Sequence, residues 1–278
     1  MNNPTLKTPI VDIGINLMHR SFQQDREQVV ERALAHQVTP LIITGTSLRS
    51  SEEAARYAGL HPGKLYATAG VHPHDAKHCN DATIKRLKEL AALPQVVAIG
   101  ECGLDYNRDF SPREVQRRWF SEQVRLAQEL SMPLFLHERE ASADFTAILK
   151  EQQVRKAVVH CFTGNRQELT AYLEAGWHIG ITGWICDERR GKHLRELVRL
   201  IPLDRLMLET DAPFLTPRDL KEKPAEGRNE PAFLPHILHT VARCLGKSAE
   251  EVAQATTATA TSFFSIEGGG NDEAEQVR

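Results

Sequence analysis

The feature that most constrains the fold of this 278-residue chain is a regular alternation of two kinds of segment. Short runs rich in β-branched residues, typical of buried strands, alternate with longer stretches whose apolar residues recur at helical spacing. This alternation predicts repeated strand–helix units and therefore a parallel sheet. The predicted strands span residues 10–15, 41–44, 65–71, 96–101, 134–137, 157–160, 178–182 and 206–209.

Predicted helices fill the gaps between these strands and also follow the last one. Eight regular units favour a closed (β/α)8 TIM barrel of the α/β class over an open doubly wound sheet, which is the alternative. We predict one barrel domain over residues 1–266 and a disordered, polar, glycine-rich tail over 267–278. The predicted helices span residues 23–36, 51–60, 82–92, 112–130, 142–151, 166–174, 191–200, 232–245 and 249–264.

Composition narrows the class of protein. The five cysteines form no Cys-x-x-Cys pair, which favours reduced thiols over a disulfide framework. No apolar run approaches the ~20 residues of a membrane span, and the first residues are polar, so we predict a cytoplasmic protein. A net charge of −3 neither indicates nor excludes a nucleic-acid partner. No obligate protein partner is evident, and a monomer is the default.

Histidine or acidic residues stand at the ends of several predicted strands. Glu101, His137 and His160 end three consecutive strands, which are adjacent in a barrel. Because a parallel barrel gathers the carboxyl ends of its strands on one face, these side chains are expected to meet there. One carboxylate with two imidazoles binds zinc, manganese or iron readily and magnesium less naturally. Taken singly, each residue is as compatible with a structural hydrogen bond; together they predict a metal site.

Further residues at strand ends suggest roles around that site. Asp211 follows the last strand and is predicted to ligate metal or to take a proton from water, although a turn aspartate is the alternative. Glu209 is expected to contact a metal-binding residue or the edge of the core rather than to bind the ion itself. His72 and His74 follow the third strand, and their distance from strands four to six suits substrate contact better than metal binding.

Basic residues cluster in loops where barrels often bind phosphate. Arg139 lies two residues beyond His137, Arg190 follows the seventh strand, and Arg228 lies in the proline-rich segment after the eighth. We predict that these three arginines contact a phosphorylated substrate, and the alternative is a solvated charged surface.

Several motifs occur in order along the chain: Gly-Val-His-Pro-His (70–74), Ile-Gly-Glu-Cys-Gly-Leu-Asp (99–105), His-Cys-Phe-Thr-Gly (160–164), Gly-Ile-Thr-Gly-Trp (180–184), Glu-Thr-Asp-Ala-Pro (209–213) and Arg-Asn-Glu-Pro-Ala (228–232). These motifs resemble those of the TatD family of metal-dependent deoxyribonucleases, and the resemblance extends from residue 10 to about 266. The resemblance implies a TIM barrel of the metal-dependent amidohydrolase type, in which Glu101 bridges two metal positions. One position resembles the set Glu101, His137 and His160.

The chain departs from the family pattern at the other position. There the resemblance implies an Asp-x-His-x-His on strand one, together with Asp211. Aligning on Asp12 places Gly14 and Asn16 where the two histidines would stand. Glycine has no side-chain ligand atom, and a neutral asparagine is a weak ligand. This second metal position is therefore predicted to bind metal weakly or to be empty.

The resemblance implies a 3′→5′ exonuclease of single-stranded DNA and RNA with a part in DNA repair or nucleic-acid turnover. It would require a divalent metal, Mg²⁺ for activity, with Zn²⁺ or Mn²⁺ compatible with the His/Glu site. Two alternatives stay open. The same groups would serve an ester or amide hydrolase such as an aminoacyl-tRNA deacylase, and the loss of ligands at one metal position would suit a metal-poor binding scaffold.

Overall fold

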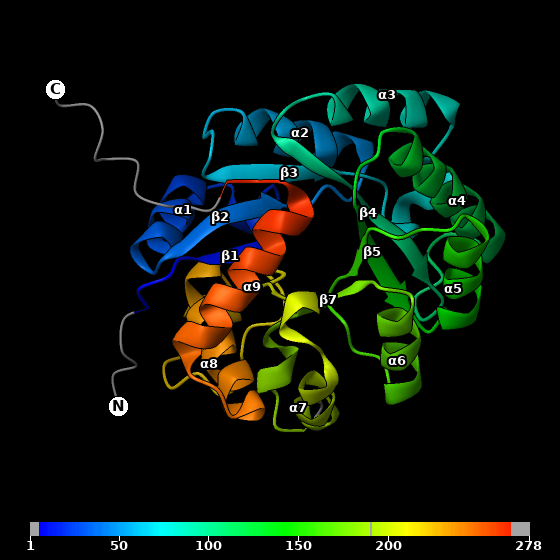
Figure 1. Cartoon of the computed structure of the whole chain (residues 1–278). Coiled ribbons are helices and arrows are strands. Elements are labelled where there is room, and N and C mark those ends of the chain that lie inside the picture. The colour runs from blue at the N-terminus through cyan, green and yellow to red at the C-terminus, as the bar shows by residue number, and fades with distance from the viewer. Residues whose placement is uncertain (1–5, 190, 268–278) are drawn as a thin grey trace, which may run out of the picture.

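Within residues 6–189 and 191–267, which the computed structural model describes, eight parallel strands form one sheet. Their order in the sheet is their order in the chain, so consecutive strands are neighbours in space (Figure 1). The strands are β1 (Ile10–Ile15), β2 (Val38–Ile43), β3 (Leu65–Ala69), β4 (Val96–Asp105), β5 (Leu134–Arg139), β6 (Ala157–Val159), β7 (His178–Ile181) and β8 (Leu206–Leu208).

The two edges of this sheet meet because the segment after β8 pairs with β1. Ile15 forms a parallel bridge with Ala212. The amide of Asp211 donates to the carbonyl of Gly14 at 2.8 Å, and the amide of Asn16 donates to the carbonyl of Ala212 at 2.8 Å. Eight parallel strands that return on themselves make a nearly closed barrel. The predicted (β/α)8 TIM barrel is confirmed.

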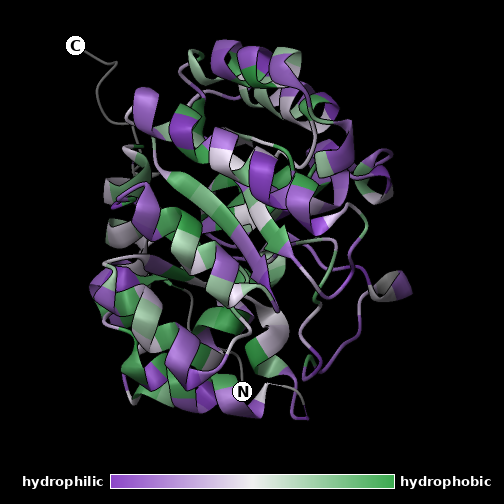
Figure 2. Ribbon diagram, turned by 90° about the vertical axis from the view of Figure 1, so that its right-hand side faces the viewer, coloured by the Kyte–Doolittle hydropathy of each residue, from purple (hydrophilic) through white to green (hydrophobic). Residues whose placement is uncertain are grey.

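Helices connect the strands and surround the barrel (Figure 1). Hydrophilic residues are frequent on their outer faces, whereas the strands that they cover are largely hydrophobic (Figure 2). Among the described helices, none is both long enough and apolar enough to cross a membrane. The α-helices are α1 (Arg26–Ala35), α2 (Leu48–Ala58), α3 (Asp81–Ala91), α4 (Arg113–Glu129), α5 (Ser142–Glu151), α6 (Arg166–Glu174), α7 (Lys192–Leu197), α8 (Leu234–Leu245) and α9 (Ala249–Phe264). Short 3-10 helices lie in the connections: η1 (Arg20–Phe22), η2 (Pro73–His78), η3 (Gly183–Cys186), η4 (Val198–Leu200), η5 (Leu203–Arg205), η6 (Ala225–Gly227) and η7 (Pro231–Phe233).

Side chains fill the barrel interior, and the end of α9 closes it on one side. The ring of Phe263 lies 4.7 Å from the ring of His178, the first residue of β7, so this plug covers the amino ends of the strands. The carboxyl ends are left for polar side chains. The buried apolar residues inside the barrel are Val11, Ile13, Ile42, Val97, Ala98, Phe135, Val158 and Met207, and those of the α9 plug are Ala260, Phe263, Phe264 and Ile266.

Strand β4 is longer than the sequence predicts, and its extension shapes the site. The prediction ends it at Glu101, but it continues to Asp105. The register with β5 becomes irregular after Ile99, and Gly103 then pairs with His137. A Cβ atom at Gly103 would lie 1.8 Å from the carbonyl oxygen of His137, so only glycine permits this close approach.

Other predicted elements differ mainly at their ends. β2 begins at Val38 rather than at residue 41, because Pro40 is accommodated within it and does not delay its start. Local signals fix several helix starts more sharply. α2, α3 and α6 begin at capping boxes formed by Ser47, Asn80 and Asn165, which satisfy backbone amides directly after the loops at the carboxyl ends of the strands.

Candidate active site

The carboxyl ends of β3 to β6 bring three histidines onto one carboxylate. Oε1 of Glu101 lies 2.8 Å from Nε2 of His160 and 3.1 Å from Nδ1 of His137. Nε2 of His72 lies 3.3 Å from the same oxygen. Glu101 and His160 are buried, and the side chains of His72 and His137 are only 13% and 19% exposed. The structure thus brings Glu101, His137 and His160 together and adds His72 to them.

The imidazoles control the charge of this carboxylate. Burial acts to raise the pKa of Glu101, but His160, His72 and a hydrogen bond with His137 outweigh it and hold that pKa well below its usual range. Burial acts to lower the pKa of His160, and the charges of Glu101 and Glu209 overcome this and raise it well above normal. Burial lowers the pKa of His72 to about 4, so this imidazole is neutral and able to act as a ligand.

A second carboxylate, Asp105, lies where β4 ends. Its Oδ2 is 2.7 Å from Nε2 of His74 and 3.4 Å from Nε2 of His137. Burial acts to raise the pKa of Asp105, but these contacts with His137 and His74 hold it below its usual range. Sequence reasoning missed this residue. The available signal was the four-residue spacing from Glu101, which places both side chains on one face if the strand continues.

Asp211 approaches the same mouth from the junction of β8 with β1. Nδ2 of Asn16 donates to Oδ1 of Asp211 at 2.8 Å. The side chain is partly exposed, yet it is surrounded by enough protein that burial raises its pKa to about 7. His160 opposes this rise, whereas the charges of Glu101 and Glu209 add to it. Asp211 is therefore electrostatically coupled to the histidine cluster.

Glu209 fills the space beside Gly14, the position at which the family resemblance implies a histidine. A Cβ at Gly14 would lie 2.5 Å from Oε2 of the buried Glu209, and a Cβ at Gly180 would lie 2.6 Å from Oε1. Oε2 of Glu209 is 3.3 Å from Nδ1 of His160, and Oε1 accepts the amide of Cys161 at 2.5 Å. Two glycines thus form a slot for a carboxylate that orients His160.

Asp12 is fully buried on β1 and faces a hydroxyl rather than an imidazole. Its two oxygens accept the amide of Thr210 at 2.9 Å and the hydroxyl of Thr210 at 2.5 Å. Burial raises the pKa of Asp12 to about 7, against the effect of these hydrogen bonds. The residue therefore ties β1 to the end of β8.

The chemistry of the histidine cluster suits a divalent metal ion. Ligand atoms of His72, Glu101 and His137 lie within 4.8 Å of one another. Nε2 of His137 is buried and has no hydrogen-bond partner among the described residues, because its 3.4 Å contact with Asp105 lacks hydrogen-bond geometry. A carboxylate with imidazoles is a ligand set for Zn²⁺, Mn²⁺ or Fe²⁺. His160, on the same oxygen of Glu101, offers a further nitrogen.

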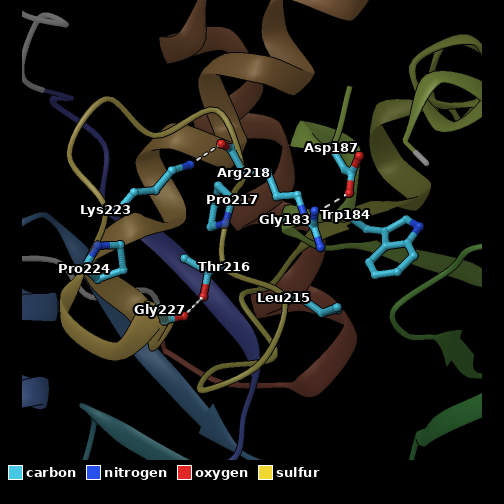
Figure 3. A pocket seen from close by; sticks show the side chains of 10 residues that line it. All are labelled: Gly183, Trp184, Asp187, Leu215, Thr216, Pro217, Arg218, Lys223, Pro224 and Gly227. Atoms are coloured by element: carbon cyan, nitrogen blue, oxygen red, sulfur yellow. Dashed lines mark hydrogen bonds and ion pairs between the residues drawn. The ribbon is translucent and has the colours of Figure 1, made fainter. Parts of the chain in front are cut away.

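Trp184, which follows β7, lines two cavities of the described structure. One, of about 840 Å³, is also lined by the exposed Arg139 at the end of β5, by Arg166 and by His193. The other, of about 360 Å³, lies between η3 and the segment 215–227 (Figure 3). The larger cavity thus combines two arginines and an aromatic ring with several glutamates, and β5 connects it to the cluster because Arg139 lies two residues beyond His137. Arginine and an aromatic ring together suit the phosphates and bases of a nucleic acid.

Of the other two arginines that the sequence predicts as substrate contacts, one has protein partners in the structure. Both terminal nitrogens of Arg228 bond to Asp25, at 2.8 Å and 2.6 Å, and one also donates to the carbonyl of Ser21. Its guanidinium lies over the ring of Phe22, 4.9 Å from the centre. Arg228 is thus tied to the segment between β1 and α1. Arg190 lies outside the described residues.

A (β/α)8 barrel with a buried carboxylate and several imidazoles at the carboxyl ends of its strands defines a hydrolase of the divalent-metal type. Comparison with known protein families supports this assignment to the metal-dependent hydrolases. The family model described as TatD related DNase matches residues 11–265. The chain belongs to this family, and is accordingly a hydrolase that acts on phosphodiester bonds.

Individual relatives are similar over almost the whole chain. The 3′-5′ ssDNA/RNA exonuclease TatD of Rahnella sp. (strain Y9602) is 52% identical over 257 residues, which cover 92% of this chain and 98% of the relative. The crystal structure of a TatD family hydrolase from Entamoeba histolytica superposes with a TM-score of 0.85 at 28% identity, covering 93% of this chain and 98% of the other. An uncharacterized amidohydrolase from Saccharomyces cerevisiae gives 0.80 at 26% identity, covering 92% and 99%. The amidohydrolase-type barrel is confirmed.

Proposed function

We propose that this chain is a metal-dependent exonuclease that removes nucleotides from the 3′ end of single-stranded DNA and RNA. The observation that carries the proposal is the convergence of three imidazoles on one oxygen of Glu101, in a chain 52% identical to a relative named for this activity. A buried carboxylate surrounded by imidazoles suits a hydrolytic metal centre. A metal-poor binding scaffold, which is the alternative, would not need imidazoles that converge on a buried carboxylate.

Glu101, His137 and His160 hold the metal ion in this proposal. When bound, a divalent ion supplies Lewis acidity toward a phosphoryl oxygen. His72 lies against the same oxygen of Glu101, so it either joins the ligands or contacts the phosphate beside them. Glu209 fixes the orientation of the His160 ring through Nδ1.

Asp211 accepts the proton of the attacking water. It reaches the mouth from the opposite side of the barrel, and the charges of Glu101 and His160 both act on it. Asn16 holds Oδ1 through a 2.8 Å hydrogen bond, which fixes the orientation of the carboxylate. A base must be positioned before its strength matters, and this contact positions it.

Arg139, His74 and Trp184 form the substrate surface. Arg139 lies in the 840 Å³ cavity two residues beyond His137, where its cationic head can neutralise a phosphate. His74 is 33% exposed and is anchored by Asp105, so its ring is held at the mouth. Trp184 offers an aromatic wall on which an unpaired base can stack, and this favours a single-stranded substrate.

Digestion of single-stranded DNA labelled at its 5′ end tests the proposal. Wild-type protein with Mg²⁺ or Mn²⁺ should yield a ladder that shortens one nucleotide at a time, whereas a 3′ label should be released at once as a mononucleotide. The substitutions Glu101→Gln and Asp211→Asn, checked for an unchanged melting temperature, should abolish both products. If the wild-type protein leaves DNA and RNA intact with magnesium, manganese and zinc, the exonuclease assignment is wrong, and ester or amide hydrolysis takes its place.

A matched pair of arginine variants separates substrate contact from structural support. Arg139→Ala should raise the KM for single-stranded DNA and reduce the dependence of binding on salt, because one phosphate contact is lost. Arg228→Ala should leave KM nearly unchanged and lower the melting temperature, because its guanidinium bonds to Asp25. An equal effect of both variants on KM would place Arg228 in the substrate surface after all.

We also propose Mg²⁺ as the activating ion, a single hydrolase domain over residues 1–266, and a monomer that acts in the cytoplasm. The span 11–265 of the matching family model supports the domain. Five free cysteines support a reducing compartment. A role in DNA repair stays a prediction from the family resemblance.

A further inference from the structure

A second group of potential metal ligands lies apart from the histidine cluster at the mouth. Cys186 is the last residue of η3, Asp219 lies in the segment that joins β8 to α8, and His236 lies in the first turn of α8. Ligand atoms of these three residues lie within 4.8 Å of one another. Three segments that are separate in the sequence therefore present a thiol, a carboxylate and an imidazole to one point.

The contacts around these residues hold them in place. Nε2 of His236 lies 2.6 Å from Oδ1 of Asp219. The fully buried Cys186 places its Sγ 3.6 Å from Oγ1 of Thr240, which lies one turn beyond His236 on the same face of α8. The side chains of Asp219 and His236 remain 23% and 26% exposed, so the group is open to solvent on that side.

The chemistry of this group differs from that of the active site. A thiolate with an imidazole and a carboxylate is a typical ligand set for zinc, whereas Mg²⁺ and Ca²⁺ prefer oxygen ligands alone. Asp219 and His236 by themselves would make an ordinary hydrogen-bonded pair. It is the thiol of Cys186 beside them that makes the combination specific for a soft or borderline metal ion.

We propose that Cys186, Asp219 and His236 form a zinc site that fastens the β8–α8 connection to η3 and α8. The thiol releases its proton to solvent as the sulfur–zinc bond forms, and a water molecule completes the four ligands. The site is independent of the nuclease assignment, since it shares no residue with the histidine cluster.

The position of the site gives it a structural consequence. Arg218, which precedes Asp219, forms an ion pair of 3.1 Å with Asp187, which follows Cys186. Figure 3 shows this pair at the wall of the 360 Å³ cavity, where Pro217 and Gly183 also lie. An ion bound next to this pair links the same two segments a second time. Zinc therefore fixes one wall of this cavity.

Cobalt substitution tests the site without any measurement of activity. Metal-free full-length protein titrated with Co²⁺ should develop the near-ultraviolet charge-transfer band of a cobalt–thiolate bond, and Zn²⁺ should displace it. Cys186→Ser should abolish the band. Asp219→Asn and His236→Asn should keep the thiolate but weaken cobalt binding by roughly tenfold or more, the equivalent of at least one lost ligand.

Matched controls separate this site from the rest of the chain. Cys244→Ser and His239→Asn, both on α8 like His236, should leave the band unchanged. Cys161→Ser and Glu101→Ala should also retain it, because both residues belong to the mouth of the barrel. Zinc should raise the melting temperature of the wild type and of these controls more than that of His236→Asn.

Three results would overturn the proposal: no charge-transfer band in the wild type, an undiminished band in Cys186→Ser, or unchanged cobalt affinity in both Asp219→Asn and His236→Asn. If Cys186→Ser does not fold, the two asparagine variants decide, since they replace partly exposed side chains and leave the buried thiol in place. A wild-type protein that binds cobalt through this thiol but does not digest DNA would retain the zinc site and reject the exonuclease.

Discussion

The two halves of the barrel mouth treat enclosed carboxylates in opposite ways. In the half built by β3 to β6, imidazoles contact Glu101 and Asp105, and the pKa of each carboxyl group is held below its usual range. In the half built by β1 and β8, Asp12 and Asp211 receive hydrogen bonds from neutral groups, and burial raises the pKa of each to about 7. Enclosure is therefore not what decides the charge of a carboxylate; its neighbours do.

This contrast assigns different work to the two halves. The imidazole-rich half is suited to hold a cation, because its carboxylates stay ionised and ring nitrogens lie close to them. The other half is suited to proton transfer and to closing the barrel, because its carboxylates change charge near neutral pH. Glu209 connects the two, since it occupies the slot beside Gly14 and bonds to His160.

The sharpest test of the contrast compares Glu101→Gln with Asp12→Asn. Both residues are buried, and both substitutions replace an ionisable carboxyl group with a neutral amide of the same shape. We expect Glu101→Gln to lower kcat/KM on single-stranded DNA by roughly 10³-fold, the scale of losing one preorganised electrostatic group at a reacting centre. Asp12→Asn should cost far less activity, because Asp12 bonds to Thr210 and not to the histidines. Equal losses in initial rate would show that the two halves are not distinct in function.

A smaller effect is expected when the connection between the halves is weakened. Glu209→Gln retains the shape of the side chain but loses the charge that orients His160. We expect metal affinity to fall by about 10–100-fold, with activity partly restored at high metal concentration. Glu138→Gln is the matched control, since Glu138 bonds to the amide of Ala141 and the hydroxyl of Tyr172 instead of an imidazole. Loss of activity that added metal does not restore would show that Glu209 acts in another way.

The slot beside Gly14 can be tested by filling it. A methyl group there would meet Glu209 at 2.5 Å and the ring of Phe135 at 3.1 Å. We expect Gly14→Ala to reduce the free energy of unfolding by about 1–3 kcal/mol, as overpacking typically does. In a Glu209→Ala background the cost should shrink, and a double-mutant cycle in urea measures this coupling. The same cost in both backgrounds would mean that Glu209 does not set the limit at this position.

Much of this arrangement follows from regular patterns in the sequence. Alternating strand and helix signals predict the barrel, and the rule that strand ends meet places Glu101, His137 and His160 together. The family resemblance identifies Gly14 as a departure. Neither pattern explains why a histidine is absent there. The reason is spatial, since Glu209 from the other end of the sheet fills that volume.

The features that escaped prediction depend on backbone irregularity and on long-range partners. Asp105 joins the site because β4 continues past a change of register, and periodicity alone cannot predict such a continuation. The partner of Arg228 is equally long-range, since its guanidinium bonds to Asp25, some two hundred residues away in the chain. Similarly, Cys186 and His236 each look like packing residues until the fold places them beside Asp219.

The influence of neighbours on a carboxylate can also be tested away from the barrel mouth, at Asp25. There we expect the smallest effect of a substitution. Asp25 is a carboxylate with cationic neighbours, and hydrogen bonds from Arg228, opposed by burial and aided by Arg32, lower its pKa to about 2. Because the folded-state pKa lies below the ordinary value of 3.8, this group stabilises the fold above about pH 4, and the stabilisation is lost as the pH falls toward about 2.

After allowance for solvent screening, we expect Asp25→Asn to lower the free energy of unfolding by about 1 kcal/mol near neutral pH. Urea unfolding of both proteins should show this difference shrinking as the pH is lowered through that window. A difference that stays constant with pH would mean that the ion pair contributes no net stability, and that the variant acts through its altered hydrogen bonds.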